Sequence, residues 1–211
     1  MGSSAATSTA VCRALSGHLG VDLDANEISE LVFEAEKIVH GTPSGIYNTV
    51  VAYEMHVYFI NGQNPDTSEP GKLFRLVIGD TGIEAPTKET VANVRKAWQN
   101  EPGLMEGYFD EIEKITRNGK IAIESGNAEQ VGELMDENHE LLNSIGVGHK
   151  ILEELVEIAR EKGALGAKLT GGGGGGNMVA LAEDKETQKK LCDAITETGY
   201  SAFLLVPPST A

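Results

Sequence analysis

Two glycine-containing segments have residue types suited to holding the phosphates of a nucleotide. The first, Gly2-Ser3-Ser4-Ala5, opens a stretch in which apolar residues recur with helical spacing. Unpaired backbone N–H groups, the positive end of a helix dipole and two hydroxyl groups together suit a triphosphate and its Mg²⁺. On this tetrapeptide alone, however, an ordinary serine-capped helix is the better interpretation, because serine commonly begins helices.

The second segment is a run of six consecutive glycines, 171–176, that follows Lys168-Leu169-Thr170. Six glycines lose much conformational entropy on folding and contribute no side chain to a core. A flexible linker is the competing interpretation, but linkers rarely separate two apolar strands such as 164–169 and 178–181. The run therefore predicts close approach of the backbone to a ligand.

Composition narrows the classes of partner. The chain has 211 residues, 40% of them hydrophobic, and a formal charge of −15. This charge disfavours nucleic acid and anionic membranes, and no apolar run approaches the roughly 20 residues that span a bilayer. With only two cysteines, Cys12 and Cys192, no disulfide framework or metal-binding cluster is predicted. We expect a cytoplasmic protein that binds a small molecule or nucleotide.

The pattern of apolar residues and turn formers predicts an α+β fold. Near the N-terminus we expect a helix over 3–18, a second helix from Asn26 as N-cap to 40, and a strand or hairpin over 49–60. Turn formers at 61–71 indicate a linker. Beyond it, strands are predicted at 74–78, 164–170, 178–182 and 202–206, and helices at 87–99, 104–118, 127–143, 148–162 and 184–198. This order favours helices on one face of an antiparallel sheet.

Five segments of the chain are recognisable as a set. They are GSSAA at 2–6, EKIVHGTPSGIYNTVVAY at 36–53, IGDTG at 78–82, NHELL at 138–142 and GALGAKLTGGGGGGNMVAL at 163–181. Their order and spacing resemble the archaeal mevalonate kinases of the GHMP kinase superfamily. The resemblance implies a GHMP kinase fold, with an N-terminal domain related to ribosomal protein S5 and a ferredoxin-like C-terminal domain. It also implies transfer of the ATP γ-phosphoryl group to mevalonate, bound with ATP between the domains, in isoprenoid biosynthesis.

The resemblance assigns domains and site residues by position. We expect an N-terminal remnant at 1–62, which lacks the first strands of the fold, a linker at 63–71 and a C-terminal domain at 72–211. Gly2, Ser3 and Ser4 match the second motif of the family, and Ser4 and Glu36 match its Mg²⁺ ligands. The third motif falls on Lys168–Gly176 and assigns phosphate binding to Lys168, Gly171, Gly173 and Gly174.

Two departures from the family pattern predict a kinase that is poor or inactive. The chain starts after the family's first motif, which includes a lysine that orients the substrate hydroxyl. We therefore expect this lysine to be lacking. The family also has an aspartate where this chain has Tyr47. A phenol is protonated at neutral pH and cannot replace a carboxylate that accepts the hydroxyl proton. A genuine kinase completed by a segment supplied in trans is one alternative.

Other departures gather on the same motifs, at Glu54, Met55, His56, Gly172 and Asn177. Their clustering favours an engineered fragment, so a second alternative is an engineered scaffold with a new binding or hydrolytic site around Tyr47, Glu54 and His56.

That alternative has two forms. On a strand, Glu54 and His56 would share a face and could act with a nearby hydroxyl or thiol in ester hydrolysis; a solvated strand face is the plainer interpretation. Tyr47, Met55 and His56 could instead anchor a designed protein partner or an apolar ligand. Exposed strand edges would also permit a homodimer.

Overall fold

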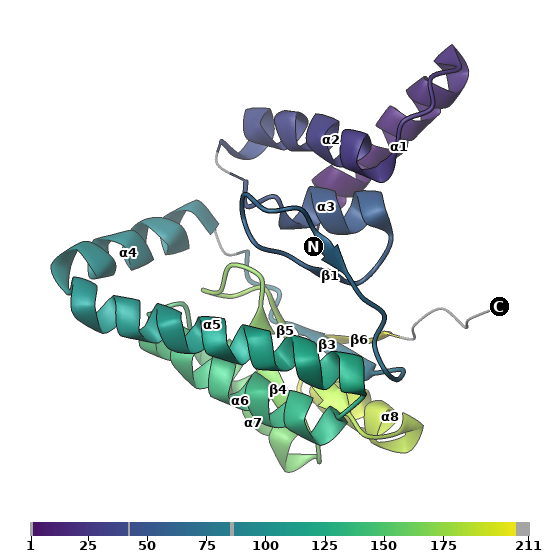
Figure 1. Ribbon diagram of the computed structural model, residues 1–211. Coiled ribbons are helices and arrows are strands. Elements are labelled where there is room, and N and C mark those ends of the chain that lie inside the picture. The colour runs from purple at the N-terminus through teal and green to yellow at the C-terminus, as the bar shows by residue number, and fades with distance from the viewer. Residues whose placement is uncertain (1, 42, 85–86, 206–211) are drawn as a thin grey trace. The chain divides into compact units, whose positions relative to one another are not determined.

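The structure is a computed structural model that describes residues 2–41, 43–84 and 87–205 (Figure 1). The chain divides into two units, Met1–Pro70 and Gly71–Ala211, which are described separately below. In chain order, the elements of the first unit are α1 (Ser3–Leu19), α2 (Ala25–His40), α3 (Ile46–Tyr53), β1 (Val57–Tyr58) and β2 (Asp66–Thr67). Those of the second are β3 (Arg75–Asp80), α4 (Thr87–Asn100), α5 (Pro102–Ser125), α6 (Ala128–Ser144), α7 (Lys150–Glu161), β4 (Gly166–Thr170), β5 (Asn177–Ala182), α8 (Lys185–Glu197) and β6 (Ser201–Leu205).

Helices α1 and α2 form where the sequence predicts them, but α2 begins at a different cap. Asp24, rather than Asn26, is the N-cap. Its Oδ1 accepts from the Glu27 N–H at 2.9 Å, and its own N–H donates to Glu27 Oε2 at 2.9 Å. This reciprocal pair is a capping box, which satisfies two groups that the first turn would otherwise leave unpaired. Asn26 lies inside the first turn, where its amide donates to Glu30.

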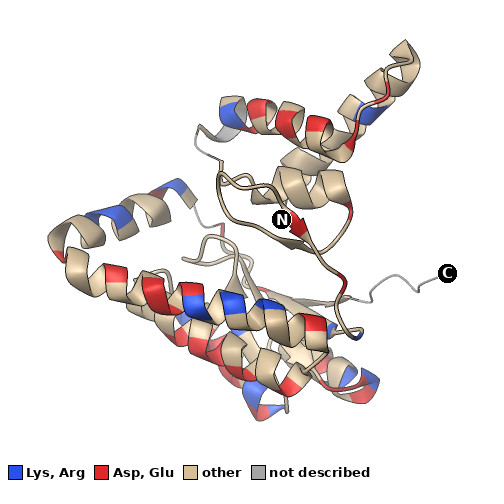
Figure 2. Cartoon of the chain, in the orientation of Figure 1, with Lys and Arg blue, Asp and Glu red and all other residues tan. Residues whose placement is uncertain are grey.

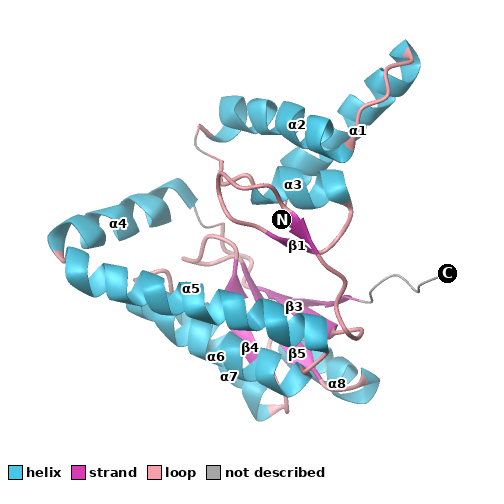
Figure 3. Ribbon diagram, viewed as in Figure 1, coloured by secondary structure: helices cyan, strands magenta, loops and turns pink. Residues whose placement is uncertain are grey.

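The strand or hairpin predicted at 49–60 is wrong, because its first part, 49–53, is the end of a helix. Helix α3 covers Ile46–Tyr53, and only Val57–Tyr58 forms a short strand, paired with Asp66–Thr67 in the segment predicted as a linker (Figure 3). Asn48, Thr49 and Ala52 are buried, a spacing that places one helical face against α1 and α2. Packing of this face outweighs the β-propensity of the segment, a preference that depends strongly on context.

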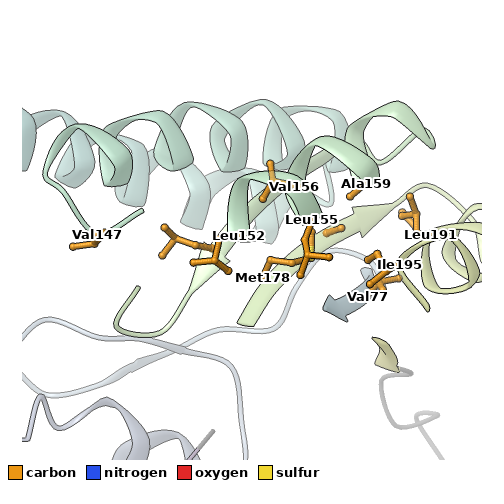
Figure 4. Close-up of a cluster of buried hydrophobic side chains, with 13 residues drawn as sticks. Val77, Val147, Leu152, Leu155, Val156, Ala159, Met178, Leu191 and Ile195 are labelled. Carbon is orange, nitrogen blue, oxygen red and sulfur yellow. The ribbon is translucent and has the colours of Figure 1, made fainter. Parts of the chain in front are cut away.

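The second unit is built on a four-stranded antiparallel sheet in the order β4-β5-β3-β6. All four strands lie where the sequence predicts them, although Val206 of the last predicted strand lies outside the described residues. Helices α7 and α8 cover one face, where alternate strand residues meet them (Figure 4). This core contains Val77, Ala167, Leu169, Met178, Ala180 and Ala182 from the strands, with Leu152, Leu155, Val156, Ala159, Leu191 and Ile195 from the helices. The α+β prediction is confirmed.

Helix α6 lies along β4, a strand at the edge of the sheet. Glycine faces glycine at this contact: a Cβ on Gly132 would overlap the Leu165 carbonyl oxygen, and a Cβ on Gly166 would overlap that of Gly132. The close approach lets α6 side chains reach the outer N–H groups of β4. Asp136 Oδ1 accepts from the Ala167 N–H at 2.8 Å, and His139 Nδ1 accepts from the Leu169 N–H at 3.2 Å. An otherwise open strand edge is thereby satisfied.

Helices α5 and α4 continue outward from this contact. Helix α5 packs on α6 and extends beyond the predicted 104–118, since it begins at Pro102 and ends at the left-handed Gly126. Acidic side chains are spread over helices of both units rather than gathered in one place (Figure 2). Among the described residues, no helix has the length and apolar character needed to cross a membrane.

Replacement of Gly132 by alanine tests the α6–β4 contact. Because the new methyl group meets backbone rather than a movable side chain, we expect Gly132→Ala to lower the free energy of unfolding by about 2 kcal/mol or more. Gly119→Ala on α5 is the matched control, since a Cβ there meets nothing within 4 Å. It should raise stability by about 0.5–1 kcal/mol through helix propensity. Urea unfolding of wild type, Gly132→Ala and Gly119→Ala measures both changes. Equal free energies of unfolding for wild type and Gly132→Ala would contradict the close α6–β4 contact.

Candidate phosphate and metal site

The N-terminal end of α1 is open to an anion. Its N-cap, Gly2, adopts a left-handed conformation with φ 67° and supplies no side-chain cap, and the first turn carries no acidic residue. The first N–H groups of a helix have no partner within the helix, and together they form its positive end. These groups are therefore available to a negatively charged ligand.

Ser4 and Glu36 meet beside this helix end. The Ser4 hydroxyl donates a hydrogen bond to Glu36 Oε1, across 32 positions of sequence. Glu36 is only 5% exposed although it carries a carboxylate. Hydroxyl and carboxylate oxygens are the protein ligands that Mg²⁺ prefers, and Mg²⁺ usually takes only one or two side chains beside substrate phosphates. The pair fits such an ion, whereas the described residues contain no cluster of three or more His, Cys, Asp or Glu side chains suited to a metal.

Tyr47 lies in the same part of the first unit. It is in the first turn of α3, and a Cβ on Gly2 would lie 3.0 Å from its ring atom Cδ1. The next two residues fix this end of α3: Asn48 donates to the Ser29 carbonyl oxygen at 3.1 Å, and Thr49 donates to the Gly45 carbonyl oxygen at 2.7 Å. The Tyr47 ring therefore packs directly on the first glycine of the proposed phosphate element.

Glu54 and His56 do not form the predicted pair on a strand. Glu54 ends α3 in a left-handed conformation with φ 55°, the only non-glycine residue described with positive φ. Its carboxylate forms an ion pair with Arg13, which also donates to the Ala52 carbonyl oxygen at 2.9 Å. His56 and Met55 are exposed beyond the helix end. The strand geometry on which the hydrolytic site depends is therefore wrong.

The glycine run joins β4 to β5 as a loop held from two sides. Five of its six residues, all but Gly172, have positive φ. The Gly174 N–H donates to the Val147 carbonyl oxygen at 2.8 Å, and the Gly176 N–H donates to that of Ile83 at 3.0 Å. A Cβ on Gly173 would overlap Val147. Glycine is thus required by conformation and by close approach to the protein's own backbone.

Other N–H groups of the loop remain available for a ligand. Within the described ranges, those of Gly171, Gly172, Gly173 and Gly175 donate to no protein acceptor. Successive N–H groups in left-handed conformations form concave anion-binding surfaces. Gly172 is one of the departures from the family pattern. A Cβ at this position would lie 2.9 Å from Thr87 Oγ1 at the start of α4, so a larger residue would crowd Thr87.

Lys168 adds a cationic group just before the loop. Its ammonium donates to the Leu169 carbonyl oxygen at 2.9 Å. Burial lowers the pKa of Lys168 to about 8, because desolvation disfavours the charged form. An anion placed nearby would favour the charged form, so this side chain suits a phosphate better than a neutral ligand.

Comparison with known proteins identifies the family. The GHMP kinase N-terminal domain matches residues 1–55, and the GHMP kinase C-terminal domain matches residues 120–201. The crystal structure of Leishmania major mevalonate kinase in complex with R-mevalonate is 32% identical, with a TM-score of 0.88 over 100% of this chain and 67% of that one. The chain belongs to the mevalonate kinase family of the GHMP kinase superfamily. Mevalonate kinase from Pyrococcus furiosus is 40% identical over 209 residues, 97% of this chain.

The chain spans 61% of the length of that Pyrococcus furiosus relative. A second solved member of the mevalonate kinase family, from Methanococcus jannaschii, is 27% identical with a TM-score of 0.81, over 96% of this chain and 62% of that one. The predicted GHMP kinase fold is therefore confirmed.

The sequence did not indicate the polar side chains that connect two helices to β4, the strand before the glycine loop. His139, Asn143 and Glu153 connect α6 and α7 to β4, and none of them is among the predicted site residues. The segment NHELL at 138–142 contributes to the resemblance, but nothing in its pattern indicates a bond to Leu169. The sequence pattern also gives no sign of the glycine–backbone contacts at Val147 and Ile83, because these contacts join distant segments.

The lowered pKa of Lys168 predicts a pH dependence of stability. Between the folded pKa, about 8, and the unfolded value near 10.4, the unfolded chain binds more protons, so stability should rise with pH across this window. Below it, the charged buried lysine costs free energy. We expect Lys168→Met to remove this rise of stability with pH. It should also increase the free energy of unfolding at pH 7 by about 1–3 kcal/mol. The exposed Lys190→Met is the control; a parallel pH profile for wild type and Lys168→Met would refute the assignment.

Proposed function

We propose that this chain binds ATP with Mg²⁺ as a member of the mevalonate kinase family, and that it transfers the γ-phosphoryl group to mevalonate poorly. The observation that carries this proposal is the Ser4–Glu36 hydrogen bond at the open end of α1. It unites the two oxygen ligands that the family resemblance assigns to Mg²⁺. A carboxylate oxygen and a hydroxyl oxygen placed side by side are ligands of the kind that Mg²⁺ takes.

Phosphate-binding groups occur in each unit. In the first unit, the first turn of α1 contains no acidic residue, and its N–H groups form the positive end of the helix. In the second, four loop N–H groups and the Lys168 ammonium are suited to anionic oxygens. When bound by Ser4 and Glu36, Mg²⁺ would neutralise part of the phosphate charge, which is a main requirement of phosphoryl transfer.

Tyr47 supports the second half of the proposal. It stands at the position where the resemblance places an aspartate, and its ring packs on Gly2. A neutral phenol does not accept the proton that the attacking hydroxyl of mevalonate must lose, and proton transfer of this kind contributes about 10²–10⁴-fold to rate. Nucleotide binding and phosphoryl transfer should therefore be separable in this chain.

Nucleotide binding is tested through Ser4. In calorimetric titrations with ATP and Mg²⁺, Ser4→Ala should weaken binding by about tenfold, because one oxygen ligand and its hydrogen bond are lost. Thr7→Ala is the matched control, since the Thr7 hydroxyl lies on the same helix and bonds only the Ser3 carbonyl oxygen. Equal affinity of Ser4→Ala and wild type, or no Mg²⁺ dependence in wild type, would exclude the metal role of the pair.

Phosphoryl transfer is tested through Tyr47. Restoring the family residue in Tyr47→Asp should increase ATP-dependent phosphorylation of mevalonate by about 10²-fold or more, with ATP affinity changed by less than about threefold. Tyr47→Asn separates the charge from the change of size and should remain as slow as wild type. Rapid turnover by the unaltered chain would overturn the proposal that Tyr47 limits it.

The alternative of a new binding or hydrolytic site around Tyr47, Glu54 and His56 remains a prediction. Glu54 is engaged by Arg13, so no observation favours it over nucleotide binding.

A further inference from the structure

A polar network centred on a buried histidine bonds the strand that leads into the glycine loop, and it is separate from the groups assigned to phosphate. His139 is completely buried on α6. Its Nδ1 accepts from the Leu169 N–H at 3.2 Å, which leaves the ring proton on Nε2 in the neutral form. Nε2 lies 3.2 Å from the carboxylate of Glu153 on α7. The imidazole thus joins two helices to the strand that enters the loop.

Asn143 extends the network toward the far side of the loop. Its amide Nδ2 donates to Glu153 Oε2 at 2.9 Å, so one carboxylate holds both α6 side chains. Its Oδ1 also packs tightly against Gly148, where a Cβ would overlap it. The neighbouring Val147 carbonyl oxygen receives the Gly174 N–H at 2.8 Å. The cluster therefore bonds Leu169, two residues before the loop, and packs on Gly148, next to the Val147 carbonyl oxygen that accepts from Gly174.

We propose that His139, Asn143 and Glu153 are positioning residues that set the conformation of the glycine loop. The functional consequence rests on the proposed nucleotide site: the network fixes where the free loop N–H groups point, and so determines affinity for phosphate. Glu153 is the charged member of the network, and its side chain is 39% exposed, so its ion pair adds little to stability. Orientation of the loop is the effect that we assign to this network.

A second α6–α7 bridge provides an internal control. Asp136 accepts from the Ala167 N–H at 2.8 Å and from Arg160 Nε on α7 at 2.9 Å. Its chemistry matches that of the His139 network, because an α6 side chain bonds a β4 N–H group and an α7 partner. However, it contacts β4 two residues farther from the loop. The two bridges should differ in their effect on the loop.

The experiment compares His139→Ala, His139→Gln and Asp136→Ala in the full chain labelled with ¹⁵N-glycine. Amide hydrogen exchange of Gly174 and Gly176 reports on the loop directly, and thermal unfolding reports on overall stability. We expect His139→Ala to accelerate exchange of Gly174 by about tenfold beyond the change explained by stability, as for loss of one hydrogen bond. Glutamine, which can accept from Leu169 and donate to Glu153, should restore most of the protection. Asp136→Ala should lower stability without this local effect.

Titration with ATP and Mg²⁺ supplies the functional readout. Affinity should fall by about tenfold in His139→Ala, recover in His139→Gln and change by less than about threefold in Asp136→Ala. Unchanged Gly174 exchange in His139→Ala, or an equal local effect of Asp136→Ala, would overturn the inference. If the wild-type chain bound no ATP, the proposed function would fail, while the exchange rates would still decide whether the network positions the loop.

Discussion

The close approach of α6 to the edge strand β4 is the constraint on which the second unit depends. Only glycine at 132 and 166 leaves room for the two backbones to meet. That contact brings Asp136 and His139 within hydrogen-bond distance of successive outward N–H groups of β4. Since β4 leads directly into the glycine run, the same contact determines where the loop begins. One helix therefore both packs on the edge strand and positions the start of the loop.

The glycine loop combines two needs that are usually separate. Positive φ angles expose consecutive N–H groups to a ligand, while backbone contacts to Val147 and Ile83 restrict the freedom that glycine would otherwise have. A binding loop that is held before the ligand arrives loses less entropy on binding. Hydrogen bonds to Val147 and Ile83 thus hold the six-glycine run in one conformation, which a flexible linker would not need.

The first unit has the pair that the family resemblance assigns to Mg²⁺ and a tyrosine where the resemblance places an aspartate. Ser4 and Glu36 remain paired at the open end of α1, whereas the tyrosine at position 47 packs on Gly2. Binding of phosphate and metal needs oxygen atoms and N–H groups in fixed positions, whereas proton removal needs a side chain that can accept a proton. These requirements fall on different residues, so a substitution at one position can separate them.

The sequence by itself determined the elements whose signals are local: α1, the sheet strands, the helices between them and the two glycine segments that carry the family resemblance. Tertiary structure alone decided the rest. Residues 46–53 are mostly β-branched or aromatic, yet they form α3 because Asn48, Thr49 and Ala52 bury one helical face against α1 and α2. Likewise, His139 bonds Leu169 across 30 positions, and Glu36 accepts from Ser4 across 32. Periodicity and turn chemistry act over a few residues, whereas these partners are chosen by packing between distant segments.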